Sequence, residues 1–483
     1  VGNFSEDFEA ALKGSASNNT FPLCWSYVDE ISSTGYGFVD IANVKNGKQS
    51  YRLYRTNTTA NEDQNVVLIS PETVNLGNGT KQLRFSVKAT AVTVDNFLEI
   101  VRSNGVDATS QFSVIQTINI NHTAYKEYII PLAATTDDYF GFRLVHNGTT
   151  VATTLNLDDI FYEDLTPCIF PIGQKISNIT LNSAVLTFNP SLATGVTAYE
   201  YEVRTSGPAG SGAVGLVYSG TTTARTVTLN NLTPSTDYIV YVRSVCGTSN
   251  GDWTDYPSEF MTLCPVQTGN FSENFDTTKT GSASVNTYPR CWSYIDEIVS
   301  TGNGFVGTTN PISGKNAYRF YRTNSASNLN DNLILVSPET VNLGAGTKQV
   351  RFSVRNNSAT NKDIIEVVTL DKNDDTAVIN VIQAINVIGT SYKEFIVPLP
   401  ANSDDYFGLR LAHNGTTTAS TIYIDDVHYE DVSACVFPMN IKVSNITAST
   451  ANLSWNASLA KGVTAYEYEI RTSGEAGSGT AGL

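Results

Sequence analysis

Hydrophobic and polar residues alternate one by one in many short runs along this chain. Clear examples are residues 82–88, 97–101 and 125–130. A period of two is that of a β-strand with one buried and one exposed face. About ten such runs lie in the first 165 residues, separated by clusters of Asn, Gly and Pro. The pattern predicts a two-sheet sandwich of jelly-roll size.

The whole pattern repeats after 267 residues. The stretch NFSE at 3–6 recurs at 270–273, and CWSY at 24–27 recurs at 291–294. Of the first 50 aligned positions, 29 are identical in the two copies. Two copies this similar must share a fold, and the cysteines near 168 and 264 divide each repeat into a larger and a smaller part.

The smaller part has a pattern of its own. Alternating runs at 184–188 and 198–204 precede the stretch LTPSTDY at 232–238, which continues into another alternating run. This resembles a fibronectin type III domain, whose late strands carry a Leu-x-Pro-x-Thr-x-Tyr corner. In the second copy Trp455 stands where Phe188 does, which restores the family's usual core Trp.

The larger part is similar to the MAM-like jelly-roll modules of the choice-of-anchor J group. The resemblance rests on an opening NFSEDFE at 3–9, an early Cys24-Trp25, a late YFG at 139–141 and a closing LDDI at 157–160. Alternation of such modules with fibronectin domains is typical of large surface and secreted proteins of the Bacteroidetes, gliding-motility adhesins among them.

The expected architecture is all-β, with tandem jelly-roll sandwiches alternating with fibronectin type III sandwiches. We assign jelly rolls to 1–166 and 266–433, a fibronectin domain to 169–263, and a truncated one to 436–483. The chain starts without Met and stops without a closing element, so it is expected to be part of a longer polypeptide.

Composition and charge exclude several partners. Among 483 residues the formal net charge is -16 with no basic block, which argues against nucleic acid and anionic membranes. No run approaches roughly 18 apolar residues, so no direct membrane insertion is expected in this segment.

Six cysteines in repeat-related positions favour disulfides and an oxidising, extracellular compartment. The repeat relates 24 to 291 and 168 to 435, which suggests the pairs Cys24–Cys168 and Cys291–Cys435. Cys246 and Cys264 would then bridge the last hairpin of the fibronectin domain. Two alternatives stay open: Cys168 could instead tie the jelly roll to its neighbour, or the thiols could be free and buried.

Acidic residues gather at both ends of each jelly roll, and the ends of such a fold usually lie side by side. Hard oxygen ligands from both ends could then hold one structural Ca2+, which the resemblance also implies. The alternatives are solvated turn residues, or a glycosidase acid–base pair. The candidate ligands are Glu6, Glu9, Asp158, Asp159, Glu273, Asp276, Asp425 and Asp426.

Other motifs have structural explanations. G-x-G-x-x-G occurs at 210–215 and 477–482, but strand-like residues follow the first match, so a loop is expected rather than a dinucleotide site. The stretch DKNDD at 371–375 lacks the Gly and closing Glu of an EF-hand. Trp25 and Trp292 are expected in the core rather than in a sugar site.

The sequence therefore predicts a non-enzymatic cell-surface adhesin or extracellular scaffold. It would be a rod of spacer and ligand-binding domains that could associate side by side, with surface glycans or other extracellular polymers as partners. The alternative is the carbohydrate-binding, noncatalytic region of a secreted hydrolase.

Overall fold

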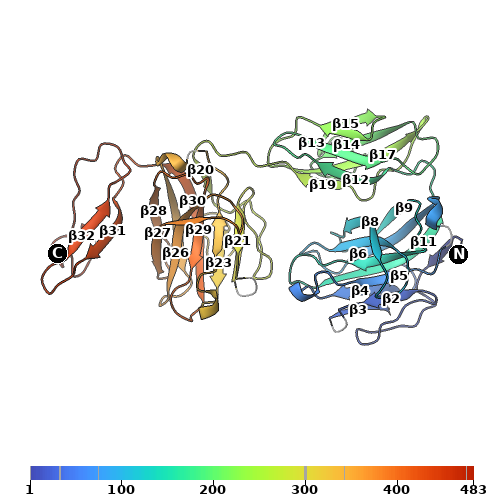
Figure 1. The fold of residues 1–483 in the computed structure, drawn as a ribbon, viewed down its shortest axis with the longest axis horizontal. Coiled ribbons are helices and arrows are strands. Elements are labelled where there is room, and N and C mark those ends of the chain that lie inside the picture. The colour runs from blue at the N-terminus through green and yellow to red at the C-terminus, as the bar shows by residue number, and fades with distance from the viewer. Residues whose placement is uncertain (1, 32–33, 74–75, 299–301, 342, 475) are drawn as a thin grey trace. The chain divides into compact units, whose positions relative to one another are not determined.

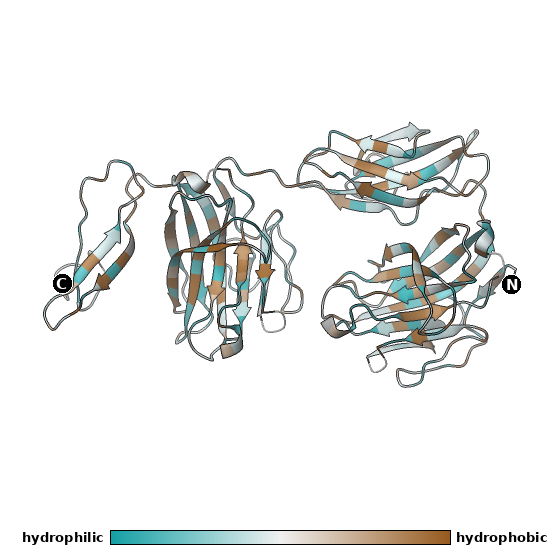
Figure 2. Ribbon diagram, in the orientation of Figure 1, coloured by the Kyte–Doolittle hydropathy of each residue, from teal (hydrophilic) through white to brown (hydrophobic). Residues whose placement is uncertain are grey.

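The protein is almost entirely β, as the alternating pattern predicts. The computed structural model describes residues 2–31, 34–73, 76–298, 302–341, 343–474 and 476–483. Their regular elements are β-strands and four short 3-10 turns, with no α-helix among the described residues. The chain divides into two compact units, 1–264 and 265–483 (Figure 1). Hydrophobic and polar residues alternate along the strands, as Figure 2 shows.

The first large sandwich consists of two antiparallel sheets. One has the order β3-β4-β11-β6-β9, with β1 beside β11, and the other has the order β2-β5-β10-β7-β8. From β4 to β11 the chain passes between the two sheets at each step except at β7 and β8, which pair with each other in one sheet. Crossing between two antiparallel sheets in this way is typical of a jelly roll. The strands are β1 (Phe4–Glu6), β2 (Ser26–Asp29), β3 (Gly35–Asp40), β4 (Ser50–Arg55), β5 (Val66–Ile69), β6 (Lys81–Ala89), β7 (Phe97–Ser103), β8 (Phe112–Asn119), β9 (Lys126–Leu132), β10 (Tyr139–Leu144) and β11 (Thr153–Asp164).

The small sandwich completes the first unit with sheets β12-β13-β16 and β15-β14-β17-β18, and β19 also pairs with β17. At its predicted corner, the Tyr238 hydroxyl accepts the Thr233 N–H at 2.7 Å. That bond fixes the turn leading into the long β17. The strands are β12 (Ile172–Ser177), β13 (Ala184–Asn189), β14 (Ala198–Arg204), β15 (Leu216–Thr222), β16 (Thr226–Leu229), β17 (Asp237–Cys246), β18 (Ser249–Asn250) and β19 (Ser258–Met261).

The second unit repeats the large sandwich in the same order and register. Phe271 opposes Tyr429 as Phe4 opposes Tyr162. The hairpin of β31 and β32 follows it. The strands are β20 (Phe271–Glu273), β21 (Ser293–Asp296), β22 (Gly302–Gly307), β23 (Ala317–Arg322), β24 (Leu333–Val336), β25 (Lys348–Asn356), β26 (Lys362–Leu370), β27 (Ile379–Ile388), β28 (Lys393–Leu399), β29 (Tyr406–Ala412), β30 (Ser420–Asp431), β31 (Met439–Ser444) and β32 (Asn452–Asn456).

Each large sandwich has an aromatic core at the point where its first and last strands pair. Trp25 packs edge-on against Phe4 and Phe140, with ring centroids 6.3 and 6.0 Å apart. Trp292 makes the equivalent contacts in the second copy. The two tryptophans are only 4% and 5% exposed, which confirms their predicted place in the core.

Candidate functional site

The acidic residues at the end of the first large sandwich lie on a β-bulge of β11. The register against β6 shifts between Asp158 and Phe161, and Asp159 has a φ of 50°. The Asp158 carboxylate is buried and accepts the N–H groups of Asp159 and Lys45, both at 2.9 Å. Burial raises the pKa of Asp158 to about 6, although these bonds oppose the shift.

The other predicted ligands of the first copy also accept protein hydrogen bonds. Glu6 accepts the Phe8 N–H at 2.7 Å, and Glu9 accepts those of Lys48 and Gln49 at 2.6 and 2.8 Å. The Asp159 carboxylate lies 3.1 Å from the Lys45 ammonium. Since β1 pairs with β11, the two ends of the sandwich do lie side by side, and their carboxylates hold the segment 45–49.

The second copy repeats this arrangement with several side chains exchanged. Asp425 accepts the Ile312 N–H at 3.0 Å and Asp276 accepts the Lys315 N–H at 2.7 Å. Glu273 accepts the Phe275 N–H. Ile312 replaces Lys45, and Asp426 accepts the Ser313 hydroxyl at 2.6 Å. No group of three or more His, Cys, Asp or Glu within the described ranges is arranged to hold a metal, so calcium stays a prediction.

The cysteine pairing suggested by the repeat is wrong. Cys168 forms a disulfide with Cys246 of the small sandwich. The Cys168 sulfur atom lies 3.6 Å from the Ser244 carbonyl oxygen on the same strand, β17. Cys264 and Cys291 are disulfide-bonded as well, whereas Cys24 and Cys435 are exposed free thiols. The alternative in which Cys168 ties the large sandwich to its neighbour is confirmed.

The remaining motifs are turns. The glycine-rich segment 210–215 leads into β15, and the buried Arg204 guanidinium donates to the Gly212 and Val214 carbonyls at 3.0 and 2.7 Å. In the segment 371–375, Asp374 accepts the Thr376 N–H at 2.9 Å. These bonds agree with the loop interpretation of each motif.

The small sandwich is fastened to the first large one by more than the disulfide. Phe170 and Tyr256 are buried against each other, with ring centroids 5.6 Å apart at 82°, in the same hydrophobic core as the large sandwich. The Asp255 carboxylate accepts the Ile129 N–H of β9 at 3.1 Å, and its carbonyl accepts the Lys126 ammonium at 3.1 Å. We call this set of contacts, with Cys168–Cys246, the junction.

Asp255 gives the junction a defined pH dependence. Burial raises its pKa from 3.8 to about 6, so the folded chain binds this proton more tightly than the unfolded chain does. Protonated Asp255 therefore stabilises the folded chain below about pH 4, and this contribution to the free energy of unfolding is lost as the pH rises to about 6. Asp255→Asn keeps an acceptor for Ile129 without the charge. We expect it to gain stability on the wild type across this window, by up to about 3 kcal/mol.

Urea unfolding at intervals between pH 4 and pH 7 measures this gain. Asp63→Asn, which removes an exposed carboxylate of the large sandwich, is the control, with no expected change in the pH dependence. If the curves of Asp255→Asn and the wild type run parallel over the whole range, Asp255 is not buried at the junction.

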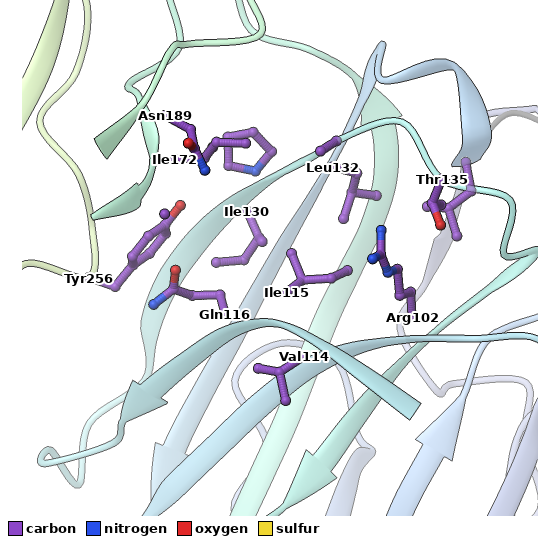
Figure 3. A pocket seen from close by; sticks show the side chains of 14 residues that line it. Arg102, Val114, Ile115, Gln116, Ile130, Leu132, Thr135, Ile172, Asn189 and Tyr256 are labelled. Atoms are coloured by element: carbon purple, nitrogen blue, oxygen red, sulfur yellow. The ribbon is translucent and has the colours of Figure 1, made fainter. Parts of the chain in front are cut away.

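A groove of about 280 Å³ lies beside the junction (Figure 3). The large sandwich contributes β8 and β9, and the small sandwich contributes the ends of β12 and β13 and the segment containing Tyr256. The residues that line it are Leu76, Arg102, Val114, Ile115, Gln116, Ile130, Pro131, Leu132, Ala133, Thr135, Ile172, Gly173, Asn189 and Tyr256. Sequence reasoning missed this site, because its lining residues carry no motif and meet only after the two domains pack.

Comparison with known proteins identifies one domain of this chain. Residues 171–259 match the fibronectin type III domain. A search of curated proteins found no match. The described part of the chain contains no helix with the length and apolar character needed to cross a membrane.

Several solved structures are similar to parts of this chain at low sequence identity. The K1 cleaved adhesin domain of Lys-gingipain from Porphyromonas gingivalis W83 is 19% identical and covers 34% of this chain and 99% of that domain, with a TM-score of 0.27. The K2 cleaved adhesin domain of Lys-gingipain is 18% identical and covers 33% of this chain and 99% of that domain, also with a TM-score of 0.27. The tandem CBM22 domains of Paenibacillus barcinonensis Xyn10C are 11% identical and cover 89% of this chain and 96% of that one, with a TM-score of 0.24.

TM-scores this low assign no function. The small sandwich has both the matching sequence and the strand order expected for its family. The chain thus contains a fibronectin type III domain, covalently fastened to a jelly-roll sandwich whose sequence and fold recur in the second unit.

Proposed function

We propose that this chain is a segment of a non-enzymatic extracellular adhesin or scaffold. The observation that carries the proposal is the junction: a disulfide, a buried aromatic pair and the Asp255 hydrogen bond make the jelly roll and the fibronectin domain one stiff block. The jelly-roll sandwich recurs after 267 residues, and a polypeptide that repeated the whole block at that period would keep its binding surfaces at regular spacing. Disulfide-bonded cysteines fit an oxidising compartment.

Repeated weak sites raise avidity without any new contact, because each further binding event becomes intramolecular. Surface glycans and other extracellular polymers, which repeat their own units, are the partners that suit such an array. The MAM-like assignment, the Bacteroidetes origin and side-by-side association remain part of this proposal.

The alternative, a carbohydrate-binding noncatalytic region of a secreted hydrolase, is favoured by the groove beside the junction, where polar side chains converge on an apolar bed. Both alternatives share glycan binding and differ in what the segment is joined to. Intact mass and peptide mapping of the native polypeptide distinguish them, because further copies favour the adhesin and a nonrepeating catalytic domain favours the hydrolase.

Adhesion measured against surface density tests the proposal. The 483-residue chain is coupled to beads at several densities, and bead retention is measured on cells and on purified extracellular polysaccharide. We expect retention to rise steeply with density while the soluble chain binds weakly. Retention proportional to density, or release of reducing ends from the polysaccharide by the chain alone, would contradict a multivalent, non-enzymatic role.

We also propose calcium at the two acidic clusters, as a structural ion that adds to the contacts of the segments 45–49 and 312–316. Carboxylate oxygens are suitable ligands for this ion. Addition of EDTA to the full chain is expected to lower its melting temperature. An unchanged melting temperature would contradict the calcium proposal and mean that these carboxylates act through their hydrogen bonds alone. Replacing both Asp158 and Asp159 by Ala would still lower the stability in that case, because it removes those hydrogen bonds.

A further inference from the structure

We propose that the groove beside the junction binds a neutral saccharide residue of an extended glycan. The inference rests on the proposed glycan-binding function and adds the location and chemistry of the site. The volume of about 280 Å³ lies at the lower end of small-molecule pockets. A groove of this size suits one or two residues of a polymer rather than a large free ligand.

The walls of the groove provide apolar surfaces from both domains. Ile115 and Ile130 come from the jelly roll, whereas Ile172 and Tyr256 come from the fibronectin domain. Tyr256 is only 6% exposed and is held edge-on by Phe170, so its ring is rigid before any ligand arrives. The buried ring therefore forms a fixed end wall of the groove, while the partly exposed Ile115 and Ile172 provide the apolar surface for the C–H groups of a pyranose. A wall that is already ordered costs little conformational entropy on binding.

The polar side chains of the groove match hydroxyl groups. Gln116 and Asn189 line it from opposite domains, and Figure 3 shows both beside Tyr256. Each side-chain amide offers two donors and one acceptor oxygen, whereas a sugar hydroxyl both donates and accepts. Two amides near an apolar ring therefore recognise a polyol better than they recognise an ion.

The charge in the groove favours a neutral ligand. Among the described residues that line it, only Arg102 carries a charge. The Arg102 Nε lies 3.2 Å from the Asp137 carboxylate, which offsets this charge. The chain as a whole has a formal net charge of -16, which repels acidic glycans at a distance.

The exposed edge of β8 is poorly suited to an added peptide strand. Its pairing with β7 shifts register between Ile100 and Val101, which leaves Ile115 as an extra, bulged residue. The Gln116 side chain also donates to the Thr117 carbonyl at 2.8 Å. A bulge and an occupied carbonyl interrupt the regular ladder that strand addition requires.

The second unit provides a matched control within the same chain. Gln383 occupies the position of Gln116 beside the same bulge, and Thr369 occupies the position of Arg102. Because Thr369 does not reproduce the Arg102–Asp137 ion pair that borders the groove, we expect the saccharide site of the first unit to be absent from the equivalent surface of the second.

The experiment measures binding of the full chain to an array of immobilised neutral and sialylated oligosaccharides. The variants are Gln116→Ala, Asn189→Ala and Arg102→Thr, with Gln383→Ala as the control. We expect the wild type to bind neutral oligosaccharides. Gln116→Ala and Asn189→Ala should each weaken binding at least about tenfold, whereas Gln383→Ala should leave it unchanged. Melting curves check that each variant remains folded.

Three results would overturn the inference. Full binding by Gln116→Ala and Asn189→Ala would place the glycan elsewhere, while glycan binding itself would stand. A preference for sialylated oligosaccharides would overturn the neutral ligand. Absence of binding to every oligosaccharide would overturn the saccharide class, and bead retention on cells would then show whether the adhesin role survives with another partner.

Discussion

Replacing Cys168 and Cys246 together by Ser is expected to lower the free energy of unfolding of the first unit by about 4 kcal/mol. The bond joins residues 78 apart in sequence. Closing a loop of that length restricts the unfolded chain by an amount between the roughly 3 kcal/mol of a 15-residue loop and the roughly 5 kcal/mol of a 100-residue loop. The double variant should also lose the stiffness of the junction, because the covalent link between the linker and the fibronectin domain is gone.

Calorimetry of the full chain measures this effect as a lower transition temperature of the first unit. Cys24→Ser removes an exposed free thiol and is the control, with no expected change. An unchanged transition in the double variant would mean that the two cysteines are not bonded in the folded protein. Small-angle X-ray scattering of the same variant then reports whether the fibronectin domain still keeps one position on the jelly roll.

Phe140→Ala is expected to destabilise the first large sandwich by about 3–5 kcal/mol, the usual range for a buried aromatic replaced by Ala. Phe140 is fully buried on β10. Its ring lies 6.0 Å from Trp25, 5.7 Å from Tyr162 and 6.1 Å from Phe142, measured between centroids. Phe140 also stacks on Phe4 of β1 at 6.2 Å, so it lies between the first strand and Tyr162 of the last. Its removal would leave a cavity where β1 pairs with β11.

The second copy provides the control. Phe407 occupies the same place, 5.8 Å from Trp292 and 5.6 Å from Tyr429. Phe407→Ala should lower the transition of the second unit by a similar amount and leave that of the first unchanged. If either substitution shifted both transitions equally, the two units would not unfold independently.

Much of the fold was predictable because it depends on local patterns. Alternation along each strand and turn residues between strands identify two-sheet sandwiches. The stretch at 232–238 predicts the corner that the Tyr238–Thr233 hydrogen bond closes. Trp25 and Trp292 are in the core as expected, since each lies in an apolar run next to a strand.

The disulfides were predictable in kind but wrong in pairing. Repeat symmetry relates Cys24 to Cys291 and Cys168 to Cys435 and suggested a bond within each jelly roll, whereas Cys168 bonds to Cys246 of the small sandwich. Spacing along the chain carries no information about which strands lie opposite a cysteine. Cys168 meets Cys246 because the fibronectin domain packs against the jelly roll, and that contact is tertiary.

By itself, the sequence determined the all-β class, the 267-residue repeat and the fibronectin corner, because each follows from residues near in sequence or from internal similarity. The juxtaposition of the acidic ends followed from the jelly-roll fold that these patterns predict, whose ends usually lie side by side. Only the tertiary structure decided the junction and the groove. Gln116, Asn189 and Tyr256 lie on different strands and segments of two domains, and none belongs to a motif. They converge because burying Phe170 and Tyr256 between the domains removes apolar surface from water, and that packing sets where polar side chains meet.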